Sequence, residues 1–171
     1  MRSSPRCASI CSSSRRILKS PGEMEGTSRP KVFAAFATDS MSRALMPRGA
    51  RVVVYLGGLD SYKGIDTLID AVPLVLREEP RAHFLILGYP GLDEYRHRVA
   101  VRALSDAVTL YGPIPYCDVP AYLALASVAV APKYLRWGES NGKIFNYMGA
   151  ALPVVAFDYA MNREIMGATN P

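Results

Sequence analysis

From Arg51 onward, short apolar segments alternate with longer segments whose apolar residues recur at helical spacing. The short segments are rich in apolar and β-branched residues, as expected for strands covered on both faces of a parallel sheet. They occupy residues 51–56, 82–88, 107–112, 128–131 and 154–157. With right-handed crossovers, this alternation predicts an α/β fold: a Rossmann-like open parallel sheet with helices on both faces.

The segments between the predicted strands carry helix signals. Residues 59–80 place apolar side chains on one helical stripe, and Asp60 or Ser61 is available as the N-cap. Pro73 should kink this helix rather than end it. Residues 92–104 are predicted to form a strongly charged amphipathic helix.

Residues 1–31 differ in composition from the rest of the chain. They hold seven Lys/Arg against two Glu, with many Ser and no hydrophobic period, which is typical of a disordered basic leader. The leader superficially resembles a transit peptide but lacks an amphipathic helix, so an upstream extension is the preferred interpretation. Residues 32–50 are predicted to be a linker or a short helix, and residues 51–171 one domain.

Outside the leader the charge is balanced, with 13 basic and 13 acidic residues, so no nucleic-acid-binding face is indicated. The longest apolar runs, such as AYLALASVAVAP, are well short of the roughly 18 residues that a transmembrane helix needs. We therefore expect no transmembrane segment and no nucleic-acid partner. The expected location is the cytoplasm, either free or peripheral to a membrane.

Cysteine and histidine are too few for several classes of site. Cys7 and Cys11 lie in the leader and Cys117 stands alone, so neither a disulfide framework nor a metal-ligand spacing is present. His83 lies within an apolar segment and is predicted to be a strand residue without a catalytic role. His97 is the second of only two histidines, which argues against most hydrolase triads.

Ligands of open parallel sheets bind outside the carboxyl ends of the strands. Four loops are expected at that edge: residues 57–63, 88–91, 112–117 and 132–143. In addition, helices that begin after these loops offer unpaired N–H groups and positive dipole ends, which favour a phosphate. Anion binding is the first functional hypothesis.

The first loop combines Gly57, Gly58 and Lys63. The glycines allow close approach of a bulky group, and the lysine can reach a phosphate. The alternative is a simple glycine turn with a solvated lysine. The segment GLDSYKG has neither the spacing of a phosphate-binding P-loop nor the G-x-G-x-x-G dinucleotide fingerprint. Walker-type ATPases are excluded by spacing, and a nicotinamide-dependent oxidoreductase is disfavoured.

The fourth loop and the helix predicted to open near Gly142 hold the remaining candidates. Glu139 precedes this helix and either caps it or accepts hydrogen bonds from sugar hydroxyls. Asn141, Gly142 and Lys143 supply an amide, a position without a side chain and a second cation, which together suit a diphosphate. Asn146, one turn later, either reaches the same pocket or is a helix-surface amide.

Four segments of the chain resemble one enzyme family. VVYLGGLDSYKGIDTLIDA, HFLILG, VTLYGPIPYCDVPAYLALASVAVAP and GKIFNYMGAALPVVAFD resemble the C-terminal, nucleotide-sugar-binding domain of group 1 glycosyltransferases of GT-B fold. The family patterns are G-R-L…K-G-x-x-x-L-I-x-A and E-A-M-A-x-G-x-P-V-V-A. The resemblance covers about residues 52–167, and the ensemble of segments is specific although each piece alone is not.

The resemblance implies a donor site with Gly57, Gly58 and Lys63 near the diphosphate. It places Gly88 near the nucleoside and Gly112 near the base. Residues 139–143 would surround the sugar and phosphates, with Glu139 and Lys63 as the candidate catalytic residues.

The chain departs from the family pattern at two places. Gly58 stands where the family commonly has arginine, so phosphate neutralisation must rely on Lys63, Lys143 and helix N-termini. The second glutamate of the family is replaced by Asn146, which can hydrogen-bond a ribose hydroxyl without charge. Glu139 is one residue out of register with the first glutamate and can replace it only if the loop bends.

The resemblance also implies the chemistry: transfer of a sugar from a nucleoside diphosphate to an acceptor, with retention at the anomeric carbon. No cofactor and no obligatory metal are expected. In the family, the acceptor site lies on an N-terminal domain that is missing here, so we expect a fragment truncated at both ends, which needs that partner domain for turnover. The alternative is a non-catalytic Rossmann-like interaction domain or an inert truncated product.

Overall fold

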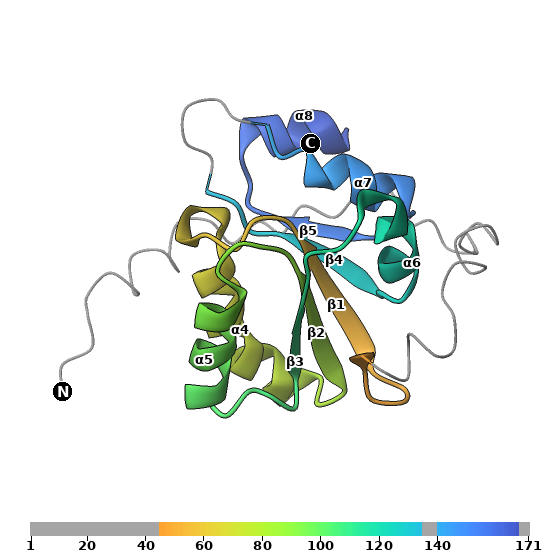
Figure 1. The fold of residues 1–171 in the computed structure, drawn as a ribbon. Helices are drawn as coiled ribbons and strands as arrows, with labels where there is room; N and C mark the ends of the chain where they lie inside the picture. Colours follow the sequence, from red (N-terminus) through yellow and green to blue (C-terminus); the bar gives the residue numbers. More distant parts are fainter. Residues whose placement is uncertain (1–44, 135–139, 168–171) are drawn as a thin grey trace.

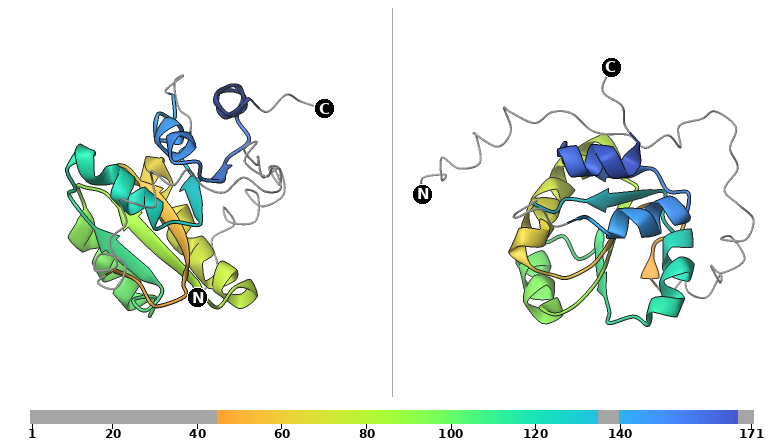
Figure 2. Two further views of the ribbon diagram at one scale, coloured as in Figure 1. Left: turned by 90° about the vertical axis from the view of Figure 1, so that its right-hand side faces the viewer. Right: turned by 90° about the horizontal axis from the view of Figure 1, so that it is seen from above.

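The computed structural model describes residues 45–134 and 140–167, within which five strands form one parallel sheet with helices on both faces (Figures 1 and 2). The strands are β1 (Arg51–Leu56), β2 (Ala82–Leu87), β3 (Val108–Tyr111), β4 (Val128–Ala131) and β5 (Val154–Ala156). The order across the sheet is β3-β2-β1-β4-β5. Starting from β1, the chain adds β2 and β3 on one side and then β4 and β5 on the other, while all strands stay parallel. The predicted fold class is confirmed.

The helices connect successive strands, except for the last helix, which follows β5. The α-helices are α4 (Ile65–Glu78), α5 (Leu92–Val101), α6 (Val119–Ala124), α7 (Lys143–Gly149) and α8 (Ala160–Met166), and the 3-10 helices are η1 (Ser61–Lys63) and η2 (Tyr116–Asp118). None of the helices in the described residues has the length and apolar content that crossing a bilayer requires.

Alternate residues of the central strands enter two separate cores. Val54 and its register partner Leu85 belong to the core under α6 and α7. Tyr55 and Ile86, one position further on, belong to the core under α4 and α5. This two-sided burial explains why the strands are almost uniformly apolar in sequence.

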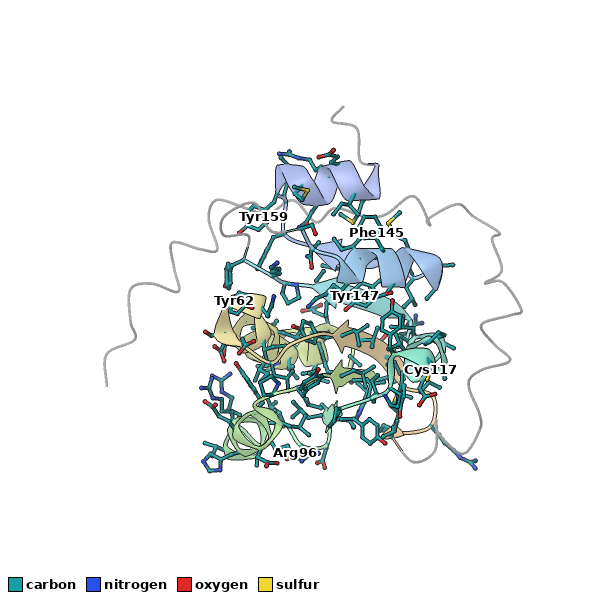
Figure 3. The ribbon with its side chains drawn as sticks, turned by 45° about the horizontal axis from the view of Figure 1, so that its top comes forward. Tyr62, Arg96, Cys117, Phe145, Tyr147 and Tyr159 are labelled. Carbon is teal, nitrogen blue, oxygen red and sulfur yellow. The ribbon has the colours of Figure 1, made fainter. Side chains whose placement is uncertain are left out.

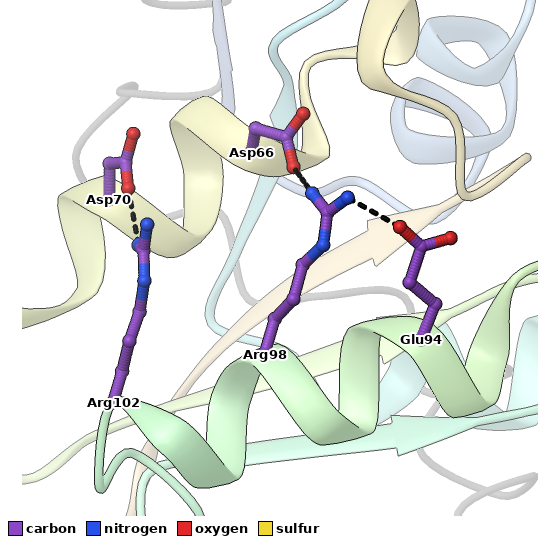
Figure 4. A network of polar contacts seen from close by, with 5 residues as sticks. All are labelled: Asp66, Asp70, Glu94, Arg98 and Arg102. Atoms are coloured by element: carbon purple, nitrogen blue, oxygen red, sulfur yellow. Dashed lines mark hydrogen bonds and ion pairs between the residues drawn. The ribbon is translucent and has the colours of Figure 1, made fainter.

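Helices α4 and α5 are joined by ion pairs on their solvent side (Figure 4). Arg98 of α5 binds Asp66 of α4 at 2.6 Å and also pairs with Glu94. Arg102 pairs with Asp70 in the same way. Because these side chains are largely exposed, each pair contributes little to stability, up to about 1 kcal/mol. The buried stripes of the two helices must contribute most of their attachment.

Two helix boundaries differ from those predicted. Asp60 and Ser61 do not cap α4: Asp60 precedes η1, and α4 begins only after Gly64, which has a φ of 83°. The predicted cap was wrong because the chain makes an extra 3-10 turn before the helix. Pro73 lies inside α4 without ending it, as predicted, whereas α5 stops at Val101, earlier than predicted.

The predictions for residues 1–31 and for residues 32–44 lie outside the described residues. Of the segment between the leader and the domain, Leu45 and Met46 pack against the core under α6 and α7. The Leu45 carbonyl also accepts a hydrogen bond from the Thr109 hydroxyl at 3.0 Å.

Candidate functional site

A pocket of about 750 Å³ opens at the carboxyl edge of the sheet. Residues from all four predicted loops contribute to its lining. The lining consists of Leu56, Gly57, Gly58, Lys63, Gly88, Tyr89, Ile114, Tyr116, Val119, Lys133, Ser140, Asn141, Gly142, Lys143 and Asn146. Segments that are far apart in the sequence therefore meet at the edge where parallel sheets bind ligands.

The four loops are held together by close backbone contacts at glycines. A Cβ atom on Gly88 would lie 1.9 Å from the Gly57 carbonyl oxygen, and one on Gly112 would lie 2.6 Å from the Gly88 oxygen. A Cβ on Gly64 would lie 1.9 Å from the Pro132 oxygen, which joins the first loop to the fourth. Side chains at these positions would force the loops apart, so the glycines set the spacing of the pocket walls.

Three lysines from separate segments line this pocket: Lys63 at the end of η1, Lys133 after β4 and Lys143 at the start of α7. No aspartate or glutamate belongs to the described part of the lining. Such an excess of positive charge in a concave site favours an anionic ligand. Because η1 and α7 are short, the lysines must supply most of this attraction rather than helix dipoles.

Lys143 has the most unusual environment of the three lysines. Its Nζ atom is buried without a hydrogen-bond partner and lies 3.8 Å from the centroid of the Tyr55 ring. Burial, with a smaller contribution from Lys63 and then Lys133, lowers the pKa of Lys143 to about 7. The amine is therefore poised between its neutral and charged forms near neutral pH.

Polar contacts connect the two described ends of the fourth loop, residues 132–134 and 140–143. The Lys133 side chain is buried, and its Nζ donates to the Ser140 carbonyl at 3.1 Å. The Asn141 side chain is also buried, and its amide donates to the Ala131 carbonyl at 3.5 Å. The Asn141 Oδ1 atom is buried without a hydrogen-bond partner, so it remains an acceptor for a ligand donor.

Two exposed tyrosines border the pocket. Tyr89 follows β2, and Tyr116 begins η2; 63% and 75% of their surfaces are exposed, respectively. The Tyr116 hydroxyl donates to Asn146 Oδ1 at 2.9 Å, which links the third loop to α7. These rings provide flat apolar surfaces beside the charged part of the pocket.

The structure brings most of the predicted site residues together. Eight line the pocket: Gly57, Gly58, Lys63, Gly88, Asn141, Gly142, Lys143 and Asn146. Gly112 does not line it but packs behind Gly88. Glu139 lies outside the described residues. Lys133, Tyr89 and Tyr116 were not predicted, although each follows closely after a predicted strand.

Within residues 45–134 and 140–167, the pocket lining includes neither His83 nor a metal-binding group. His83 is a buried residue of β2 whose Nε2 hydrogen-bonds the Thr109 hydroxyl at 2.8 Å, far along the strand from the pocket. The described residues contain no group of three His, Cys, Asp or Glu side chains that could hold a metal ion.

Comparison with known proteins identifies the family. The family model described as "Glycosyl transferases group 1" matches residues 50–170, which includes every strand of the sheet and all four loops of the pocket. The chain belongs to the group 1 glycosyl transferases. The resemblance noted from the sequence is thus confirmed.

Individual relatives agree with this assignment. The chain is 33% identical over 132 residues to the GDP-mannose-dependent alpha-(1-6)-phosphatidylinositol monomannoside mannosyltransferase of Mycobacterium tuberculosis, covering 71% of this chain and 34% of the relative. It is 28% identical over 108 residues to the alpha-D-kanosaminyltransferase of Streptomyces kanamyceticus, covering 63% of this chain and 28% of the relative. The chain thus spans about a third of the length of these relatives.

Solved structures show the same fold. The S. aureus TarM structure, determined with UDP, superposes with a TM-score of 0.59 at 20% identity, covering 70% of this chain and 24% of TarM. The C-terminal domain of a group 1 glycosyl transferase (LpcC) from Francisella tularensis gives a TM-score of 0.53 at 19% identity, covering 65% of this chain and 59% of that domain. The described residues therefore correspond to the C-terminal half of a GT-B fold.

Proposed function

We propose that this domain binds a nucleoside diphosphate sugar and forms the donor half of a glycosyltransferase. The observation that carries the proposal is the meeting of Lys63, Lys133 and Lys143 in one pocket with no carboxylate in its described lining. A diphosphate is a compact anion that three converging cations neutralise well. The named relatives support this ligand class, since one is GDP-mannose-dependent and the TarM structure holds UDP.

The pocket suggests how such a donor is arranged. The diphosphate lies against Gly57 and Gly58, where no side chain blocks its approach, with the lysine amines around it. The nucleoside extends toward Gly88 and the exposed ring of Tyr89, with Gly112 supporting Gly88 from behind. Asn141 and Gly142 contact phosphate or sugar, and Asn146 offers an uncharged amide to a ribose hydroxyl.

The proposed reaction is transfer of the sugar with retention at the anomeric carbon. Its transition state separates a positively charged sugar from a diphosphate leaving group, so the greatest demand is to stabilise the developing negative charge. In this proposal Lys63 and Lys143, which both line the pocket, meet this demand. The proposed role of Glu139 is to contact the sugar hydroxyls.

Because the chain spans about a third of its relatives, turnover is proposed for the complete enzyme. In that enzyme a second domain binds the acceptor and closes the donor pocket. The proposed location is the cytoplasm, where the acceptor is either soluble or held at a membrane surface.

Calorimetric titration of the 171-residue chain with UDP-glucose and GDP-mannose tests donor binding. We expect measurable binding of at least one donor. The Lys63→Ala variant should weaken this binding by about 1–3 kcal/mol, because it removes a charged partner of the diphosphate. The matched control is Arg77→Ala, which removes the same charge from an exposed position on α4 outside the pocket.

The control variant should bind like the wild type. Absence of heat with both donors would contradict the proposal and favour a non-catalytic or inert domain. Equal affinity of the wild type and Lys63→Ala would place the diphosphate elsewhere.

We also propose that donor binding requires no divalent metal, since lysine amines provide the positive charge in the pocket. Repeating the titration with EDTA should leave the dissociation constant unchanged. Loss of binding on chelation, restored by Mg²⁺ or Mn²⁺, would contradict this part of the proposal.

A further inference from the structure

The Lys143 amine lacks a hydrogen-bond partner among the described residues. Its Nζ atom is buried and lies over the face of the Tyr55 ring, 3.8 Å from the ring centroid. The backbone of Gly57 closes over it, since a Cβ there would lie 2.8 Å from Nζ. A permanently charged ammonium is costly in such a place.

Among residues 45–134 and 140–167, the groups that face this amine do not offset its charge. From η1 and from the segment after β4, Lys63 and Lys133 add like charge, and both lower the Lys143 pKa. On β1, the Tyr55 hydroxyl donates to the Gly58 carbonyl at 2.7 Å, and its pKa is raised by burial, so the tyrosine is neutral. The negative charge of Asp60 raises the pKa of Tyr55 further, and it is not among the causes that shift the pKa of Lys143.

The neighbour on its own helix is also neutral. The pKa of Tyr147 is raised by burial, and its hydroxyl is engaged by the backbone of β1 and β4. The described surroundings of Lys143 therefore tolerate a neutral amine and provide no counter-charge for an ammonium.

We infer that Lys143 takes up a proton when a diphosphate enters the pocket, so that anion binding and protonation of this amine form one coupled step. The inference rests on the proposed function and adds a way in which the site selects its ligand. A diphosphate supplies the missing counter-charge, whereas a neutral sugar or a nucleoside does not. Only the anionic ligand then gains the full attraction of all three lysines.

The coupling has a definite pH dependence. With a Lys143 pKa of about 7 in the protein without ligand, the amine is already charged below this pH and little proton uptake accompanies binding. Above it, binding must add the proton. Linkage then predicts uptake of about half a proton per ligand at pH 7, approaching one at pH 8, with affinity falling up to about tenfold per further pH unit.

Calorimetry in buffers of different ionisation enthalpy measures this uptake directly. The probes are UDP-glucose and GDP-mannose, because their phosphates are esterified at both ends of the diphosphate and do not titrate near pH 7. We expect proton uptake by the wild type at pH 8. Lys143→Met and Lys143→Arg should both bind without it, since methionine carries no proton and arginine never loses one.

The control is Lys63→Ala, which should weaken binding but still show proton uptake at pH 8. Binding by the wild type without proton uptake would overturn the inference while leaving the proposed function standing. Equal uptake by Lys143→Met would do the same. No binding of either probe would overturn the proposed function and the inference with it.

A second measurement needs no ligand. The folded-state pKa of Lys143 lies below that of an unfolded lysine, so the unfolded chain binds more protons between pH 7 and pH 9. The free energy of unfolding should therefore rise with pH in this window, by up to about 1.4 kcal/mol per pH unit. Lys143→Met should remove the rise, and an identical pH profile in the variant would overturn the inference.

Discussion

The three pocket lysines occupy different environments. The Lys63 amine lies 4.4 Å from the centroid of the neighbouring Tyr62 ring. The Lys133 amine is buried and donates to the Ser140 carbonyl. The Lys143 amine is buried without a hydrogen bond. Lys133 thus also connects the segment after β4 to Ser140, next to Asn141, whereas Lys143 has no hydrogen bond to lose among the described residues, which suits it to respond to a ligand.

A glycine-to-alanine pair tests the close contact between the first and fourth loops. Gly64→Ala combines a φ of 83° with a Cβ atom only 1.9 Å from the Pro132 carbonyl oxygen. Gly49→Ala has a similar φ of 74° but open space around the new methyl group. We expect a loss of unfolding free energy of about 1–2 kcal/mol for Gly49→Ala, from backbone strain alone.

The loss for Gly64→Ala should be clearly larger, and donor binding should weaken as the loops separate. Chemical denaturation of both variants measures the difference. Equal losses would show that the contact with Pro132 does not constrain the loops.

Some residues of the pocket could be predicted from the sequence, and others could not. Lys63 and Lys143 were predictable because each adjoins a glycine at the start of a predicted helix. Lys133 was missed because it has no glycine neighbour, although its position two residues after β4 was a usable signal. The location of Gly112 behind Gly88, rather than in the lining, depends on the register of β2 and β3, which sequence spacing does not define.

At the scale of elements, α7 is attached to the sheet through one buried tyrosine. The Tyr147 hydroxyl accepts a hydrogen bond from the Leu56 N–H at 2.8 Å and donates to the Val130 carbonyl at 3.2 Å. Figure 3 shows Tyr147 on the sheet side of α7, with Phe145 on the other side. These bonds connect the helix that carries Lys143 to both β1 and β4.

Replacement of this tyrosine tests the attachment. Tyr147→Phe leaves the partly buried Leu56 N–H without its partner, so we expect a loss of unfolding free energy of about 1–3 kcal/mol. The matched control is Tyr89→Phe, which removes a hydroxyl from a ring that is 63% exposed and should change stability by less than about 0.5 kcal/mol. Thermal or urea unfolding of both variants provides the comparison, and a Tyr147→Phe protein as stable as the control would refute the attachment.

The elements themselves were largely predictable, but their ends were not. Apolar periodicity identified the five strands and the helices α4 and α5, because burial leaves a strong signal, whereas α8 was not predicted. The start of α4 was misplaced because Gly64 must leave the helix to pass Pro132, a contact between residues far apart in sequence. Likewise, α5 ends before Ala103, which has a φ of 54°, and nothing in the local pattern indicates that turn.

At the scale of the whole molecule, the pocket is a product of topology. The sheet order β3-β2-β1-β4-β5 places the loops after β1 and β4 side by side, although Lys63 and Lys143 are 80 positions apart in the sequence. The convergence of the loops followed from strand direction and could be predicted. The burial of Lys143 under Gly57 could not, because it depends on side-chain packing across β1 and α7.

The central claim is that four loops form one anion site at the carboxyl edge of the sheet. Backbone amide NMR spectra of the chain, recorded during titration with UDP-glucose and GDP-mannose, test it most directly. We expect the amides of Gly57, Gly88, Asn141 and Lys143 to shift together along one binding curve. Shifts confined to a single loop, or clustered around Arg81 and Ala107 in the small pocket at the start of β2, would contradict it.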